Sequence, residues 1–372
     1  MAMDHSGVQF DGGSTGQSGQ GEAERPRFNT IVVGLAASLI CLVILREFAS
    51  VIGPVFLALN LMITAYPLHT WLVRKGTPAW LSAVVVSLTV FAVLLAIVVG
   101  LIWSVTEMIS ILPEYAGEFS LIYQQGLDLA LRLGFDQTTM TRLFSTLDPT
   151  RVLGAATSVV SGTGGALALI SVVVIAIFFM AMDTPGMEGR LRRIANQRTR
   201  IATAMGCFAR GVRRYWLVTT IFGIIVAVFD GIALAIMGVP LALVWALFSF
   251  LTNYIPNIGF LIGLIPPALV ALFANGWKTA VGVIVIYSVL NFVIQSIIQP
   301  RFTGESVGVT PTVSFISLLL WTTVIGGFGT LLALPLTLLI KSLVIDADPR
   351  ARWVNALIAS DVRDADPDES SH

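Results

Sequence analysis

Long runs without a charged residue dominate the pattern of hydrophobic and polar positions along this chain. An α-helix needs roughly 20 apolar residues to cross the hydrocarbon core of a bilayer, and each of these runs is long enough. The clearest runs are residues 48–73, 76–106, 152–182, 279–300 and 306–340. The strands of a membrane β-barrel would instead alternate in polarity over about 10 residues. The pattern predicts an all-α polytopic membrane protein with about eight hydrophobic segments.

The chain divides further at changes in composition. Residues 1–28 are rich in Gly, Ser and Gln, which predicts a disordered cytoplasmic tail. Three transmembrane helices are expected within residues 29–105, and another is expected at residues 156–182. Between them, residues 106–155 place apolar side chains at helical spacing, which predicts an amphipathic extracytoplasmic insertion. Residues 346–372 form an acidic tail that we expect to be cytoplasmic.

The strongest charge signal lies in residues 183–214, which are predicted to form a basic cytoplasmic loop. Within residues 189–215 there are eight arginines and no acidic residue. The positive-inside rule places such a segment in the cytoplasm, and counting the spans in both directions puts both termini there too. An ordinary loop that sets the topology is favoured over a specific site for a lipid head group.

Two apolar stretches with a break in the middle lead us to predict a transport core at residues 215–345. The stretch at 240–276 is interrupted at residues 253–259, and the stretch at 311–344 is interrupted at residues 326–329. The arms are at or below the length that spans a bilayer. We interpret both stretches as re-entrant helical hairpins that enter the membrane from opposite faces, as in an inverted repeat. Four ordinary tilted or kinked helices are the alternative.

Both breaks combine proline or glycine with polar neighbours at a depth where free backbone groups are costly. Proline removes a backbone donor, and glycine leaves the backbone open to approach. Such backbone is tolerated only where protein or a water-filled cavity covers it, so each break is a candidate site for a polar solute. Tight-turn chemistry alone is the alternative. The candidates are Asn253, Pro256, Asn257, Gly259 and Pro266 in the first stretch, and Gly326, Gly327, Gly329 and Pro335 in the second.

Asp230 is the charged residue embedded most deeply in a predicted span. An intramembrane acid costs about 2.5 to 3.5 kcal/mol on insertion scales, which makes it a functional candidate by default. Its carboxyl group is suited to binding a cation, relaying a proton or accepting a hydrogen bond from a substrate hydroxyl. A position near the outer interface, where solvation is cheap, is the alternative.

A stripe of amides lies on the helix before the second stretch. Asn291, Gln295 and Gln299 follow one another at intervals of four residues, so they share one face of a helix. Amides both donate and accept hydrogen bonds, which suits a neutral polar solute. Hydrogen bonds between neighbouring helices are the alternative.

Composition and missing motifs exclude several classes of protein. Only 12% of the 372 residues are charged, about half the share typical of soluble domains, and the net charge of zero gives no reason to expect a nucleic-acid partner. Two cysteines and three histidines, far apart in the sequence, predict neither a disulfide framework nor a metal or cofactor site. The chain has no nucleotide-binding glycine-rich loop, and it lacks the paired carboxylates of an intramembrane aspartyl protease. We expect a protein that is not an enzyme.

Motifs in the C-terminal half of the chain resemble the core signature of the autoinducer-2 exporter family, also called PerM-like permeases. These motifs are Gly238-Val239-Pro240, Asn253-Tyr254-Ile255-Pro256-Asn257-Ile258-Gly259, Ile265-Pro266-Pro267, Gln299-Pro300-Arg301, and Leu334-Pro335-Leu336 after residues 326–329. The resemblance implies a bacterial inner-membrane transporter with export as the founding activity and autoinducer-2 as the founding substrate. Other members of that family have been assigned cation/proton exchange. Many relatives carry an acidic residue where this chain has Gln299, which weakens the case for proton or sodium coupling at that position.

These observations together predict an inner-membrane secondary transporter or facilitator that exports a small polar solute similar to autoinducer-2. The predicted site lies between the two hairpins and includes Asp230. A sodium (cation)/proton antiporter that uses Asp230 is the alternative. We also expect a homo-oligomer in the lipid bilayer, because the amphipathic insertion has an apolar face to bury.

Overall fold

The structure is a computed structural model that describes most of the apolar part of the chain. It covers residues 28–111, 117, 132, 163–197, 199–256, 258–299 and 310–346. Within these residues the chain is helical and contains no strand, which confirms the predicted all-α class. The predicted N-terminal tail, most of the amphipathic insertion and nearly all of the acidic C-terminal tail lie outside the described residues.

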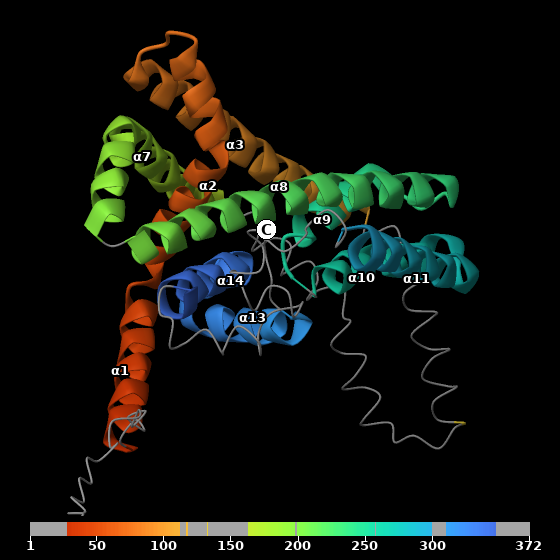
Figure 1. Ribbon diagram of the computed structural model, residues 1–372. Helices are drawn as coiled ribbons and strands as arrows, with labels where there is room; N and C mark the ends of the chain where they lie inside the picture. Colours follow the sequence, from red (N-terminus) through yellow and green to blue (C-terminus); the bar gives the residue numbers. More distant parts are fainter. Residues whose placement is uncertain are drawn as a thin grey trace, which may run out of the picture.

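The described elements are α-helices and two short π-helices, labelled as in Figure 1. In chain order they are α1 (Phe28–Glu47), α2 (Ala49–Arg74), α3 (Ala79–Ile111), α7 (Thr163–Gln197), α8 (Thr199–Ile236), α9 (Ala242–Thr252), α10 (Gly259–Asn275), α11 (Trp277–Asn291), η2 (Phe292–Ile298), α13 (Pro311–Ile325), α14 (Gly327–Ile340) and η4 (Lys341–Asp346).

In the described part of the chain, six helical segments are long and apolar enough to cross a membrane. They are α2, α3, α7, α8, α11 extended by η2, and α14 extended by η4. Three further apolar helices, α9, α10 and α13, are shorter. The protein is therefore a polytopic helical membrane protein. Because α14 with η4 is long enough to span, the second arm of the second predicted hairpin also fits an ordinary crossing.

The predicted basic loop at residues 183–214 is largely helical in the structure. Helix α7 continues to Gln197 and α8 starts at Thr199. Arginine is a good helix former, so a run rich in arginine favours helix over loop. At 38 residues, α8 is about 57 Å long at 1.5 Å per residue, well beyond the roughly 30 Å hydrocarbon core. Its arginine-rich first part therefore extends past an apolar span, and its cytoplasmic position stays a prediction.

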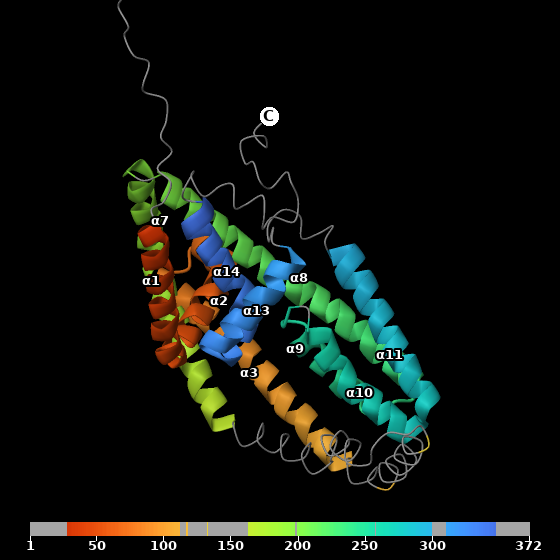
Figure 2. The ribbon, with the colours of Figure 1, turned by 90° about the horizontal axis from the view of Figure 1, so that it is seen from below.

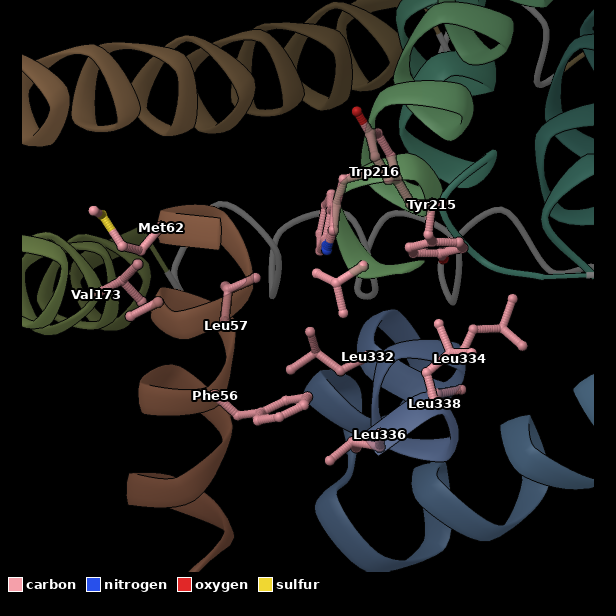
Figure 3. Packing of buried hydrophobic residues seen from close by; sticks show 14 of the residues in the cluster. Phe56, Leu57, Met62, Val173, Tyr215, Trp216, Leu332, Leu334, Leu336 and Leu338 are labelled. Atoms are coloured by element: carbon pink, nitrogen blue, oxygen red, sulfur yellow. The ribbon is translucent and has the colours of Figure 1, made fainter. Parts of the chain in front are cut away.

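Helix α8 contributes to two hydrophobic clusters. Figure 2 shows its course from α14 at one end to α11 at the other. The larger cluster joins α2, α3, α7 and the first half of α8 to α13 and α14. Figure 3 shows part of it, with Trp216 of α8 close to Leu332 of α14, and Leu57 of α2 beside them. The smaller cluster joins the end of α8, at Leu234, to α9, α10 and α11. Because lipid is as apolar as these side chains, close packing and polar contacts hold such helices together.

The chain reverses between α9 and α10 and again between α13 and α14, at the predicted breaks. We call α9 and α10 the first helix pair, and α13 and α14 the second helix pair. The first break is six residues long, from Asn253 to Ile258. The second is shorter than predicted, because Gly326 alone lies outside the helices, with φ of 66° and ψ of −138°. Glycine adopts this positive φ without the steric cost of a side chain. That each helix pair enters and leaves the membrane on the same face, as a re-entrant hairpin does, stays a prediction.

Candidate functional site

Three amide side chains meet where the first break faces the end of α11, and we call them the amide cluster. Gln295 Nε2 donates to Oδ1 of Asn253 at 2.7 Å and to Oδ1 of Asn291 at 2.8 Å. Asn291 is buried, whereas Asn253 and Gln295 are half-buried. The structure thus brings together two residues of the predicted amide stripe and one of the predicted break. The third stripe residue, Gln299, lies half-buried directly after η2.

Backbone groups of two helices fix the amide cluster in place. Asn253 Nδ2 donates to the carbonyl oxygen of Thr219 in α8 at 3.3 Å, and Asn291 Nδ2 donates to that of Tyr287 at 2.9 Å. A Cβ at Gly223 of α8 would lie 2.9 Å from Asn253 Nδ2, so the glycine leaves room for this amide. Gln295 itself lies in the π-helix η2, a rare geometry that is frequent at functional sites. The cluster presents only neutral donors and acceptors.

Asp230 is fully buried in the packing of α8 against α9 and α11. Ser249 Oγ of α9 donates to Asp230 Oδ2 at 2.6 Å. Among the described residues, the other carboxylate oxygen, Oδ1, has no hydrogen-bond partner. The hydroxyl of Tyr287 in α11 is also buried without a hydrogen-bond partner in the described part of the chain. Within the described ranges, His, Cys, Asp and Glu side chains do not gather in a group of three or more that would hold a metal ion.

The last turn of α9 connects Asp230 to the amide cluster. Ser249, which donates its hydroxyl to Asp230, accepts two hydrogen bonds on its carbonyl oxygen. These come from the backbone N–H of Asn253 at 3.1 Å and from Oγ1 of Thr252 at 3.2 Å. Ser249 is therefore bonded to Asp230 through its side chain and to Asn253 through its backbone.

Both helix pairs use a glycine to bring their two helices into close contact beside the break. Gly259, the first residue of α10, lies against the carbonyl group of Thr252, and a Cβ at this position would overlap it. Gly329 in α14 lies in the same way against the carbonyl group of Trp321 in α13. Gly326 and Gly327 are exposed at the second break. In both pairs a glycine thus lies against a backbone carbonyl group of the partner helix, although the sequences of the pairs differ.

The second helix pair also satisfies several of its polar side chains internally. Trp321 Nε1 donates to Thr337 Oγ1 at 3.0 Å, and Thr337 Oγ1 donates to Ser317 Oγ at 2.9 Å. The hydroxyls of Thr322 and Thr330 lie 2.9 Å apart near the break. These contacts hold α13 and α14 together as one unit.

The predicted prolines take different positions. Pro256 is half-buried in the first break, where its carbonyl oxygen accepts a hydrogen bond from the backbone N–H of Ile258 at 2.8 Å. Pro266 lies inside α10 and Pro335 lies inside α14, where it is buried. Both helices continue through their proline. Asn257 lies outside the described residues.

A second polar contact, which the sequence did not single out, joins α2, α8 and the first break. Trp216 Nε1 donates to Oδ1 of the fully buried Asn60 at 3.4 Å. The ring of Tyr254 packs on Trp216 with centroids 5.6 Å apart, and its hydroxyl lies 2.8 Å from that of Thr220. We call these four residues the aromatic contact. Asn60 was detectable as an amide within the uncharged run 48–73, but its partner Trp216 is distant in the sequence.

Apolar spanning helices, two broken helix pairs and enclosed neutral polar side chains define a multi-pass membrane transport protein. The family model described as AI-2E family transporter matches residues 29–347, and the chain belongs to this family. The resemblance drawn from the sequence motifs is thereby confirmed.

Curated relatives agree with this assignment. "AI-2 transport protein TqsA" of Escherichia coli K12 is 29% identical over 312 residues, covering 84% of this chain and 90% of TqsA. "Putative transport protein YhhT" of the same strain is 30% identical over 313 residues, covering 84% of this chain and 89% of YhhT. A Haemophilus influenzae relative named "Putative transport protein" is 29% identical over 351 residues, covering 90% of this chain and 97% of that protein.

Proposed function

We propose that this protein exports a small neutral polar solute, autoinducer-2 or a close chemical relative, across the bacterial inner membrane as a secondary transporter or facilitator. Membership of the AI-2E transporter family supports transport, and the name of the relative TqsA supports the substrate. The observation that carries the proposal is the amide cluster beside the first break. Its neutral donors and acceptors match a solute rich in hydroxyl groups better than they match an ion.

The two helix pairs fit a site that opens alternately to each side of the membrane. In this proposal both pairs are re-entrant hairpins that enter from opposite faces, and both termini and the basic segment are cytoplasmic. Tyr254 and Ile255 of the first break and Phe328, the second residue of α14, contribute to the same hydrophobic cluster, which is compatible with two hairpins that pack in one transport core. A homo-oligomer, held partly through the amphipathic insertion, completes the proposal.

Release of solute from proteoliposomes tests the export function. Vesicles containing the purified protein are loaded with labelled autoinducer-2, and release is compared with that from protein-free vesicles. We expect faster release with the wild type and a loss of most of that gain with Asn253→Ala. The matched control is Asn275→Ala, which removes an exposed amide at the other end of the first helix pair. If the wild type releases solute no faster than protein-free vesicles do, the proposed export is contradicted. If both variants release solute at the wild-type rate, the amide cluster is not the solute site.

A second candidate function is sodium (cation)/proton exchange at Asp230, favoured by the complete burial of this carboxyl group. Exchange predicts that a sodium gradient alone, with no solute present, moves protons across the vesicle membrane. A pH-sensitive dye trapped in the same proteoliposomes measures this movement. Proton flux that depends on sodium and is lost in Asp230→Asn supports exchange, and its absence leaves export as the function.

A further inference from the structure

We propose that Arg213 and Trp216 of α8 form a latch with Ile63 and Asn60 of α2, and that this latch closes the solute path between the amide cluster and the arginine-rich first part of α8. The latch opens without unwinding a helix, because Arg213 bonds to a carbonyl group that Pro67 leaves without its helical partner. The solute path rests on the export function proposed above, whereas the latch itself does not.

Pro67 lies inside α2 and removes one backbone donor from that helix. In a regular α-helix the N–H of residue 67 donates to the carbonyl oxygen of Ile63, four positions earlier. Helix α2 continues past the proline to Arg74, so this carbonyl group stays in the helix without that donor. In a membrane helix, such a freed backbone group has to be satisfied by a neighbour.

Arg213 of α8 is the neighbour that supplies the donor. Its Nε donates to the carbonyl oxygen of Ile63 at 3.2 Å, although the two residues are 150 positions apart in the chain. The guanidinium carbon of Arg213 also lies over the ring of Tyr66, 5.7 Å from the ring centroid, within the range of a cation–π contact. Arg213 therefore replaces the donor that Pro67 removes, and it holds α8 against α2 at this level.

The bond between Arg213 and Ile63 can open at a lower cost than the helical bond that it replaces. Breaking a backbone N–H bond inside α2 would unwind a turn of the helix. Arg213 only has to change its side-chain rotamer, after which its guanidinium group can donate to water instead. The side chain is half-buried, so it is not locked inside the protein. A bond of this kind suits a contact that opens and closes.

Trp216, one turn further along α8, extends the latch towards the amide cluster. Its Nε1 donates to Oδ1 of Asn60, which lies three positions before Ile63 in α2. The ring of Tyr254 packs on Trp216, and Tyr254 directly follows Asn253 in the first break. A movement of α2 away from α8 thus reaches the neighbour of an amide-cluster residue.

The order of residues along α8 places the latch on one side of the amide cluster. The exposed Arg210 precedes Arg213 and Trp216. Thr219 follows, and its carbonyl oxygen accepts a hydrogen bond from Asn253. From Arg213 to Thr219 the helix rises about 9 Å at 1.5 Å per residue. In the proposed export path, a solute that enters from the arginine-rich first part of α8 passes this contact, so the latch controls its access.

Thermal unfolding of purified variants tests the bond without any transport assay. Arg213→Met removes the guanidinium group but keeps an apolar stem, and we expect a lower unfolding midpoint. Pro67→Ala returns a backbone donor to Ile63, so the same change at Arg213 should lower the midpoint much less in that background. Arg210→Met is the matched control, because Arg210 contacts Cys207 of its own helix, and it should change the midpoint little.

Two results of the unfolding experiment overturn the role of the freed carbonyl group. The first is an equal loss from Arg213→Met with and without Pro67→Ala. The second is a failure of Arg213→Met to fold in both backgrounds. If Arg213→Met alone fails to fold and Pro67→Ala restores folding, the result supports the proposed bond.

Labelling of a cysteine at the amide cluster tests whether the latch closes one side. Cys41 and Cys207 are the cysteines of the chain, and both are exposed, so replacing them with serine gives a cysteine-free background. Asn253→Cys is then labelled with a charged methanethiosulfonate reagent that does not cross membranes, in inside-out and right-side-out vesicles. Arg200→Cys, at an exposed position, identifies the vesicles whose outer side carries the arginine-rich first part of α8.

We expect Arg213→Met to raise the labelling rate of Asn253→Cys about fivefold or more from the arginine-bearing side, because labelling passes through the open population. The rate from the other side should stay unchanged. Trp216→Phe, which removes the donor to Asn60 but keeps a ring, should act in the same direction. Arg210→Met should change neither rate.

The outcomes separate a latch from a purely structural contact. Unchanged labelling in Arg213→Met, or an equal rise from both sides, overturns the latch, since a merely loosened protein admits the reagent from either side. An Asn253→Cys protein that is labelled from neither side, with or without Arg213→Met, also overturns it. If labelling rises as expected while the wild type exports no autoinducer-2 from proteoliposomes, the proposed export function fails and the latch stands.

Discussion

The side-chain nitrogen of Gln295 lies 2.7 Å from the side-chain oxygen of Asn253, and the two residues are 42 positions apart in the chain. This contact ties the π-helix η2 to the break of the first helix pair. It places amides from two distant segments at one point, and under the proposed export function a solute would replace their mutual hydrogen bonds with its own. The contact is therefore the most direct target for mutation.

Replacing Gln295 with methionine keeps the length of the side chain but removes its amide. The oxygens of Asn253 and Asn291 then lose their shared donor, at a cost of about 1–3 kcal/mol. We expect the rate of solute export to fall about tenfold or more, as measured by release from loaded proteoliposomes. Export at the wild-type rate in this variant would show that the amide cluster only joins the helices.

Gly329, beside the second break, should tolerate replacement by alanine far less well than Gly327. In Gly329→Ala the new Cβ overlaps the carbonyl group of Trp321, so α13 and α14 have to separate. Overpacking of this kind costs about 1–3 kcal/mol, and we expect a lower thermal unfolding midpoint in detergent. Gly327→Ala is the matched control, because its Cβ meets no atom within 4 Å. Equal midpoints for the two variants would contradict the close contact.

Replacement by alanine should affect the stability of the protein differently at two buried serines. Ser249→Ala removes the hydroxyl that donates to Asp230 at 2.6 Å, and we expect a loss of about 1–3 kcal/mol. The hydroxyl of Ser87 in α3 has no partner among the described residues, so Ser87→Ala should be neutral or stabilising. Thermal unfolding of the purified variants measures the difference. A loss of stability in Ser87→Ala as large as that in Ser249→Ala would argue against the role of the Asp230 contact.

The aromatic contact can be divided into its polar and apolar parts at Tyr254. Tyr254→Phe removes only the hydroxyl that lies 2.8 Å from that of Thr220, and should cost about 0.5–1.5 kcal/mol. Tyr254→Ala also removes the ring that packs on Trp216, and should cost about 3–5 kcal/mol. Denaturation of the solubilised protein compares the two. Similar losses would show that the hydroxyl, not the ring, holds the first break to α8.

The sequence predicted the helices and their breaks well, because those depend on local rules. Uncharged runs of spanning length gave the apolar helices, and proline, asparagine and glycine marked the end of α9 at Thr252 and the start of α10 at Gly259. The basic segment was misread as a loop, since the charge rule says where a segment lies and nothing about its secondary structure.

The sequence predicted the candidate site only in part, because contacts between distant helices leave no local signal. The spacing of Asn291 and Gln295 indicated a shared helical face, but not that this face meets Asn253. Ser249 is an ordinary residue of an apolar helix until packing places its hydroxyl beside Asp230.

The internal hydrogen bonds of the second helix pair also bear on how the chain is inserted during synthesis. Ser317, Trp321 and Thr337 find their partners within one pair, so α13 and α14 can leave the translocon together with these groups already satisfied. Asp230 is made 19 residues before Ser249, its partner. Helix α8 therefore exposes an unpaired acid until α9 has been synthesised. Release of α8 into lipid should wait for the first helix pair, whereas the second pair needs no such delay.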